Sequence, residues 1–183
     1  MAVESKTKNI GWQAADFDLP ASQGGRTKLS DFTDKLGLLV LFSCNHCPYA
    51  KAAWPLVLDL HEKFGGKIAF VAVNPNDEKT YPEDSFEVMK EKVKEWNITF
   101  PYLHDEFQVV AKAYKAQCTP DPYLFKNNFG KFKLYYHGRI NDNWQEPEKV
   151  KEKNLEQAIE ALLEGSPASQ YQPPSIGCSI KWK

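Results

Sequence analysis

The sequence predicts an α/β fold in which helices flank a central mixed β-sheet, with a hairpin extension at the N-terminus. Two continuous apolar runs, 38–42 and 68–73, are typical of buried strands, and a helix-like segment joins them. Strand, helix and strand in this order form a β-α-β unit. Two later runs, 123–125 and 134–136, are separated by a short turn and predict an antiparallel hairpin, which makes the sheet mixed.

The first half of the chain holds the extension and the β-α-β unit. Residues 17–20 and the turn at Gly24-Gly25 predict the N-terminal hairpin. After the strand at 38–42, a helix is expected from about Cys44 to Phe64, because Gly65-Gly66 supplies a stop signal. The second apolar run then closes the unit.

The second half of the chain adds helices, the antiparallel hairpin and a tail. Apolar residues spaced three or four apart predict one helix around 86–96, and a shorter helix follows at 107–114. After the hairpin, a last helix is expected over 150–163. Residues 166–183 are rich in proline and serine and are expected to form a C-terminal tail, so that a single domain spans 1–165.

Composition limits the classes of partner. The net charge of −1, from 23 basic and 24 acidic residues, favours neither nucleic acid nor an anionic membrane. No apolar stretch reaches the roughly 20 residues that span a bilayer, and the first residues carry charges where a signal peptide has an apolar core. A cytoplasmic location is therefore expected. In that compartment, four cysteines indicate catalysis or metal binding more than permanent disulfides.

The most informative residues are Cys44 and Cys47. They are separated by two residues and lie at the junction between the predicted strand and the predicted helix. Free backbone N–H groups and the helix dipole favour a thiolate at a helix N-terminus. The thiolate is the attacking species in thiol–disulfide exchange. The pattern predicts a dithiol redox site in which Cys44 is the nucleophile and Cys47 the resolving thiol.

Four segments carry a wider pattern: Phe42–Pro48, 74–85, Cys118–Asp121 and Gly177–Trp182. Together they resemble the peroxiredoxin-like branch of the thioredoxin-fold proteins, the alkyl hydroperoxide reductase and thiol-specific antioxidant family. The resemblance covers nearly the whole chain and implies a thioredoxin-like fold. It also implies that Pro120 is cis and packs against the two cysteines, and that the backbone of Thr119 pairs with an extended substrate.

Three further residues are candidate modulators of the dithiol. His46 lies between the two cysteines, where an imidazolium would stabilise a thiolate and favour the dithiol form. A potential between about −270 and −180 mV is then expected, unless His46 is only a solvated loop residue. Cys118 precedes Thr119 and is either a third redox thiol or a small buried residue. Cys178, in the tail, is a weaker candidate of the same kind.

The chain also departs from the relatives that it resembles. Thioredoxins have a buried aspartate where this chain has Leu38, so no acidic proton acceptor is visible there. Peroxiredoxins have a proline and a threonine at fixed distances before their cysteine, and neither residue is present at those distances before Cys44 or Cys47. Arg139 is the candidate for the peroxiredoxin arginine, although it is also an ordinary strand-end residue.

The predicted function is that of a thiol–disulfide oxidoreductase acting on a disulfide in a protein or small molecule. No bound cofactor is expected, because no flavin or nicotinamide fingerprint is present, so a separate donor would supply electrons. A thiol peroxidase is the first alternative, and a redox-responsive binding protein or metal chaperone is the second. No metal site is predicted, since no second Cys or His pair accompanies Cys44 and Cys47.

Overall fold

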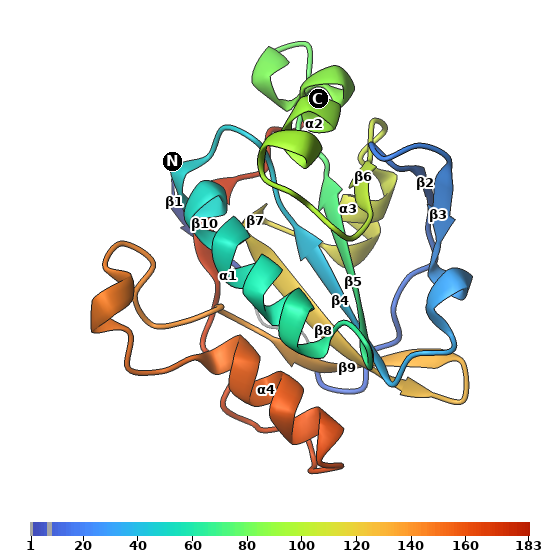
Figure 1. The fold of residues 1–183 in the computed structure, drawn as a ribbon, viewed down its shortest axis with the longest axis vertical. Coiled ribbons are helices and arrows are strands. Elements are labelled where there is room, and N and C mark those ends of the chain that lie inside the picture. The colour runs from blue at the N-terminus through green and yellow to red at the C-terminus, as the bar shows by residue number, and fades with distance from the viewer. Residues whose placement is uncertain (1, 7–8) are drawn as a thin grey trace.

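A five-stranded mixed sheet forms the centre of the computed structural model, which describes residues 2–6 and 9–183 (Figure 1). The strands lie in the order β6 (Tyr102–His104), β5 (Ile68–Asn74), β4 (Gly37–Phe42), β8 (Asp121–Asn128) and β9 (Lys131–His137). β4 pairs in parallel with β5 and antiparallel with β8. The predicted mixed sheet, with its β-α-β unit and hairpin, is confirmed.

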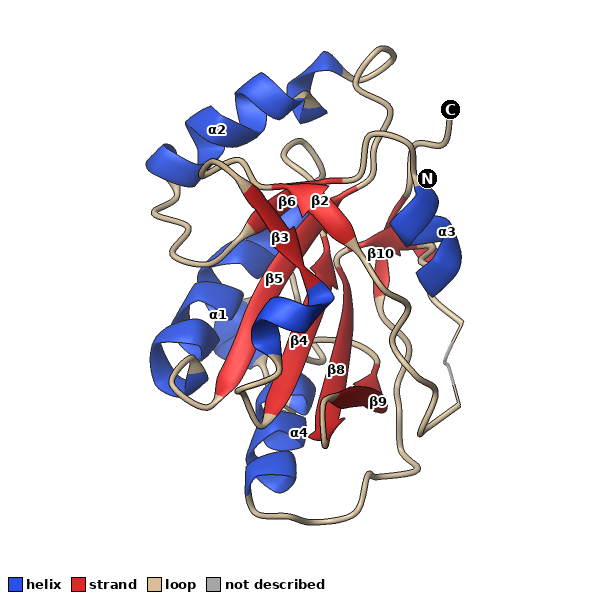
Figure 2. Ribbon diagram, turned by 90° about the vertical axis from the view of Figure 1, so that its right-hand side faces the viewer, coloured by secondary structure: helices blue, strands red, loops and turns tan. Residues whose placement is uncertain are grey.

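Helices and the N-terminal extension cover the two faces of this sheet (Figure 2). Alternate residues of β4 point to opposite faces, so a strand covered on both faces is apolar throughout. Leu39 and Leu41 pack with α1 (Pro48–Phe64) and α4 (Asn154–Leu163). The other side chains of β4 pack with α3 (Val109–Tyr114) and residues of the extension.

The remaining elements surround this core. The predicted N-terminal hairpin is present as β2 (Asp18–Pro20) and β3 (Arg26–Lys28), and the predicted amphipathic helix as α2 (Phe86–Glu95). Short 3₁₀ helices occupy Leu29–Phe32, Pro82–Asp84 and Pro147–Lys149. Within the described residues, no helix is long and apolar enough to cross a bilayer.

The first long helix begins later than predicted. α1 starts at Pro48, and Cys47 is its N-cap in an extended conformation. Proline suits the first helical position, because its φ angle fits the helix and its missing N–H would have no partner there. It also disfavours helical geometry in the preceding residue. Cys44 therefore lies in the loop between β4 and α1, three residues before the helix N-cap.

The C-terminal segment is also more ordered than a tail. Ile176–Ser179 form β10, which pairs with β1 (Ala2–Glu4) on one side and β7 (Cys118–Thr119) on the other. The proline and serine residues around this short strand hide it in the sequence. β7 alone would expose unpaired backbone groups beside the thiols, and β10 satisfies them.

Replacing Gly177 with alanine is expected to destabilise the protein by about 1–3 kcal/mol, the usual cost of overpacking. A Cβ atom there would lie 2.2 Å from the carbonyl oxygen of Thr119, so β10 must move away from β7. Urea denaturation would measure the loss. Gly66→Ala is the matched control, because a Cβ at Gly66 meets no atom within 4 Å. Equal stability of the two variants would contradict this account.

Candidate active site

Three thiols converge where the β4–α1 loop meets β10. Cys44 comes from the loop, Cys47 from the helix N-cap and Cys178 from β10, and the three pack in one cluster. The side chains of Cys44 and Cys47 are fully buried, whereas Cys178 is partly exposed. None of the four cysteines of the chain is in a disulfide in the structure.

The loop after β7 closes the other side of the two buried thiols. The Thr119–Pro120 peptide bond is cis, as the resemblance implies. The hydroxyl oxygen of Thr119 lies 3.2 Å from Cys44 Sγ, and its carbonyl oxygen lies 3.4 Å from Cys47 Sγ. In its protonated form, the Cys47 thiol donates to that carbonyl. The structure thus brings together Cys44, Cys47, Thr119 and Pro120.

The surroundings of Cys47 favour its thiolate. Hydrogen bonds from the thiols of Cys44 and Cys178, and from the backbone N–H groups of Ala50 and Cys178, lower the pKa of Cys47 to about 5 despite its burial. Ala50 belongs to the first turn of α1, where backbone N–H groups have no partner within the helix. This is the thiolate stabilisation that the sequence predicts for a helix start, but it acts on Cys47.

The surroundings of Cys44 have the opposite effect. Burial, donation of its own hydrogen bond to Cys47 and the negative charge of Asp84 raise the pKa of Cys44 well above its usual value. The sequence predicts Cys44 as the nucleophile, on the assumption that the helix begins there. Because α1 begins at Pro48, the free backbone N–H groups of its first turn lie next to Cys47 and not next to Cys44.

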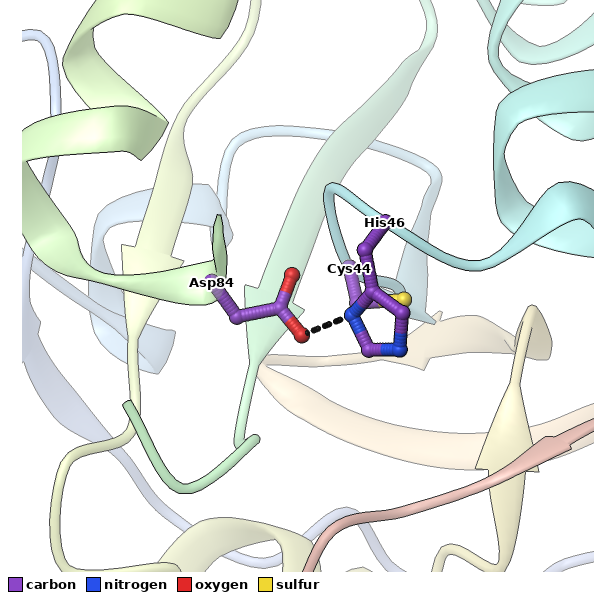
Figure 3. A group of neighbouring side chains, drawn as sticks. All are labelled: Cys44, His46 and Asp84. Carbon is purple, nitrogen blue, oxygen red and sulfur yellow. Dashed lines mark hydrogen bonds and ion pairs between the residues drawn. The ribbon is translucent and has the colours of Figure 1, made fainter. Parts of the chain in front are cut away.

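His46 is held by a buried carboxylate. Its Nδ1 atom lies 2.6 Å from Asp84 Oδ2, and Figure 3 shows the imidazole directed at this carboxylate with Cys44 beside it. The hydrogen bond to Asp84 raises the pKa of His46, although burial opposes the change. The ring of Tyr81 stacks on the imidazole with centroids 5.3 Å apart. His46 is thus fixed in the site, and it is not a freely solvated loop residue.

Asp84 itself has no exposed surface. Burial alone would raise its pKa, but hydrogen bonds from His46, Asn76 and the backbone of Asn45 outweigh burial and lower it. Asn76 Nδ2 donates to Oδ2 at 2.6 Å, and Asn45 N donates to Oδ1 at 2.7 Å. The carboxylate is therefore a fixed negative charge beside the imidazole.

Sequence reasoning missed Asp84. The position at which thioredoxins have their buried acid, Leu38, is part of the apolar core here. The acid comes instead from the 3₁₀ helix Pro82–Asp84, far along the chain from the cysteines. Its segment carries the family resemblance, which is the one signal that could have indicated a role for it.

The two accessory candidates, Cys118 and Arg139, have hydrogen-bond partners other than Cys44 and Cys47. The thiol of Cys118 donates to the carbonyl oxygen of Pro120 at 3.6 Å, and burial raises its pKa. The guanidinium of Arg139 binds Glu152 at 2.6 Å and Asn154 at 2.8 Å. Arg139 also lines a pocket next to Pro120, and its role as a counterpart of the peroxiredoxin arginine stays a prediction.

The backbone edge proposed for substrate is already occupied. Thr119 pairs with Cys178 of β10, so it does not present a free edge to an extended substrate. The prediction from the sequence was a C-terminal tail over residues 166–183, so this pairing was not expected. A pocket of about 300 Å³ remains on the other side of Pro120, lined in part by Tyr49, Trp144 and Ile176.

Cys44, His46 and Asp84 have the composition of a metal site, since one ligand atom of each lies within 4.8 Å of the others. However, the two Asp84 oxygens accept bonds from His46, Asn45 and Asn76. A metal ion would have to displace at least one of these donors. The contacts are those of an imidazolium–carboxylate pair.

Comparison with known proteins identifies a family model and a curated relative that match this chain. The model of the AhpC/TSA family matches residues 10–132, more than half of the chain. The thiol-disulfide oxidoreductase ResA of Oceanobacillus iheyensis is 28% identical over 133 residues, which is 70% of this chain and 65% of that protein. The chain thus spans slightly less than two thirds of this relative's length.

Solved structures extend the likeness to the whole fold. An uncharacterized conserved protein from Geobacillus kaustophilus has a TM-score of 0.93 and 41% identity, covering 100% of this chain and 97% of its own. The thioredoxin domain of a thiol-disulfide oxidoreductase from Bacteroides vulgatus has a TM-score of 0.58 and 19% identity, covering 72% and 91%. The second likeness supports the predicted thioredoxin-like fold.

Proposed function

Because the chain belongs to the AhpC/TSA family and has a thioredoxin-like fold, we propose that it is a thiol–disulfide oxidoreductase that uses Cys47 and Cys44. The observation that carries the proposal is the position of both thiols against the cis Thr119–Pro120 bond: the Thr119 hydroxyl lies 3.2 Å from Cys44 Sγ, and its carbonyl oxygen lies 3.4 Å from Cys47 Sγ. Cys47 is also the N-cap of α1, where the free backbone N–H groups of the first turn favour an attacking thiolate.

The exchange has two steps. The Cys47 thiolate attacks one sulfur of a substrate disulfide, forming a mixed disulfide and releasing the first substrate thiolate, which takes up a proton. Cys44 then loses its proton and attacks Cys47 Sγ, which releases the second substrate thiol and leaves a Cys44–Cys47 disulfide. A separate dithiol donor, or two equivalents of a monothiol, restores the reduced pair. No bound cofactor takes part.

His46 and Asp84 have supporting roles in this proposal. An imidazolium near Cys47 stabilises the thiolate, and the carboxylate keeps the imidazole charged to higher pH. The pocket beside Pro120 supplies apolar and aromatic surface for a side chain next to the substrate disulfide. The partner is then a disulfide-containing peptide or small molecule, without nucleic acid or membrane.

A thiol peroxidase is a second candidate, and the burial of Cys47 favours it. A thiolate with no exposed surface is more accessible to a small oxidant such as a peroxide than to a protein disulfide. In that reaction Cys47 would become a sulfenic acid, and Cys44 would displace water from it to form the same disulfide.

A redox titration tests the oxidoreductase proposal. Protein equilibrated in buffers of reduced and oxidised glutathione and digested without reduction is expected to show a reversible Cys44–Cys47 disulfide with a midpoint between about −270 and −180 mV. Reduction of a disulfide-bonded fluorescent peptide should accompany it. Fast peroxide turnover without peptide reduction would favour the peroxidase, whereas stoichiometric bound metal and no disulfide would favour a metal-binding protein.

A further inference from the structure

β10 occupies the position in which an extended substrate would pair with the chain. Its Cys178 lies opposite Thr119, and the absence of a side chain at Gly177 lets the two strands approach closely. The segment after β10 is also tied down: Lys181 N donates to Asn76 Oδ1 at 2.9 Å, and Asn76 in turn binds Asp84. The strand is part of the site, and it carries its own thiol.

That thiol lies beside the proposed nucleophile. Cys178 packs against the cluster that Cys44 and Cys47 form, and it pairs with Thr119, whose carbonyl oxygen lies 3.4 Å from Cys47 Sγ. Cys47 therefore has two thiol neighbours and could form a disulfide with either. Exposure distinguishes the two, because Cys44 is fully buried and Cys178 is partly exposed.

We propose that Cys178 is a third redox-active thiol that takes over the disulfide from Cys44 and presents it to external thiols. This inference rests on the proposed function, because it starts from the Cys44–Cys47 disulfide. Cys44 and Cys47 have no exposed surface, so the partly exposed Cys178 gives external thiols access to their disulfide. β10 thus occupies the position of a substrate strand and supplies a thiol there.

The transfer balances without an added oxidant. The deprotonated Cys178 attacks Cys47 Sγ, so that a Cys47–Cys178 bond forms and the Cys44–Cys47 bond breaks. Cys44 leaves as a thiolate and takes up the proton that Cys178 lost. An external thiol then attacks the sulfur of Cys178 and displaces Cys47, and a second thiol releases Cys178 from the mixed disulfide. The two external thiols are oxidised to a disulfide.

The acidity of the thiols suits the last part of this sequence, the attack of the external thiol on Cys178. A thiol of lower pKa leaves faster, and Cys47 has the lowest pKa in the cluster. Burial and the bond to Cys47 raise the pKa of Cys178 to about 11, while the positive charge of Lys181 opposes this rise. Attack by an external thiol on Cys178 thus expels the most stable thiolate of the three.

Disulfide mapping of Cys44→Ser tests the proposal. After oxidation with oxidised glutathione, this variant is expected to lose two hydrogens in mass and to yield a Cys47–Cys178 peptide pair. Cys44→Ser/Cys118→Ser is the matched control that should keep this disulfide, because the Cys118 thiol bonds to Pro120. Cys44→Ser/Cys178→Ser should lose it. A reduced Cys178, with Cys47 held in a dimer or on the reagent, would overturn the proposal.

Two measurements make the result independent of the folding of one variant. Partially oxidised wild-type protein should contain the Cys47–Cys178 disulfide alongside Cys44–Cys47, and its absence there would also count against the proposal. Cys178→Ser should slow re-reduction of the oxidised protein by a protein dithiol about tenfold or more, while Cys118→Ser should not. A different result would overturn the oxidoreductase proposal itself, namely wild-type protein that forms no Cys44–Cys47 disulfide at all.

Discussion

Cys47→Ser is expected to lower the rate of disulfide reduction by at least about 10³-fold, because it removes the attacking thiolate. A serine hydroxyl does not ionise near neutral pH, so neither the helix start nor the neighbouring thiols can activate it. The initial rate with a disulfide-bonded fluorescent peptide measures the effect. Circular dichroism of the variant confirms that the fold is retained.

A matched experiment compares two double variants, one that keeps Cys47 and one that keeps Cys44. Cys44→Ser/Cys178→Ser leaves Cys47 without a resolving thiol and is expected to accumulate a mixed disulfide with the peptide. Cys47→Ser/Cys178→Ser should accumulate none, since the pKa of Cys44 is raised by its burial. The reverse pattern would restore Cys44 as the nucleophile and contradict the assignment from the structure.

Asp84→Asn is expected to slow the reaction about tenfold at pH 6 and much less at pH 9. Without the carboxylate, the pKa of His46 falls and the imidazolium near Cys47 is lost more easily. Above pH 8 the thiol ionises without this help, so the two proteins converge. The rate of iodoacetamide alkylation of Cys47 against pH measures the effect. A loss of equal size at every pH would indicate a structural role only.

The same substitution should also destabilise the protein, by about 3 kcal/mol near pH 5.5, the lower end of the range for a broken buried pair. The raised pKa of His46 contributes stability below its unfolded value of 6.5, and that contribution is lost as the pH rises through the folded value. The lowered pKa of Asp84 contributes stability above 3.8, which is lost as the pH falls through the folded value.

The loss from Asp84→Asn should therefore be largest between about pH 4 and pH 6.5 and smaller at pH 9. Urea midpoints at pH 5.5 and pH 9 would show the difference. His46→Gln is the control, because it removes the titrating partner and leaves the carboxylate in place. A constant loss across this range would show that the ion pair contributes little to stability.

Much of the fold could be predicted from the sequence because the signals for it are local. Residues 68–73 of β5 are apolar throughout because both faces of the sheet are covered, and this is visible in six consecutive residues. The spacing of the two cysteines is also a local pattern of residue types, visible without long-range information. The cis Thr119–Pro120 bond was expected from the family resemblance and not from the dipeptide itself.

The missed features depend on contacts between distant segments. Asp84 reaches the cysteine loop because β5 delivers its following loop beside that of β4, and no local pattern reports this. β10 has only four residues, with one glycine and one serine among them, so its strand character comes from its partners. The start of α1 was predicted too early, at about Cys44, although a local signal for the correct start was present: Pro48 is typical of the first position of a helix.

The pairing of β10 has a consequence for the order in which the protein assembles. β1 pairs with β10 through contacts such as that of Val3 with Gly177, which close a loop of almost the entire chain. Contacts so distant in sequence form slowly, since their loop-closure entropy is recovered only after the rest has folded. The cluster of Cys44, Cys47 and Cys178 is thus completed only when β10, which follows the other described strands in the sequence, pairs with β7.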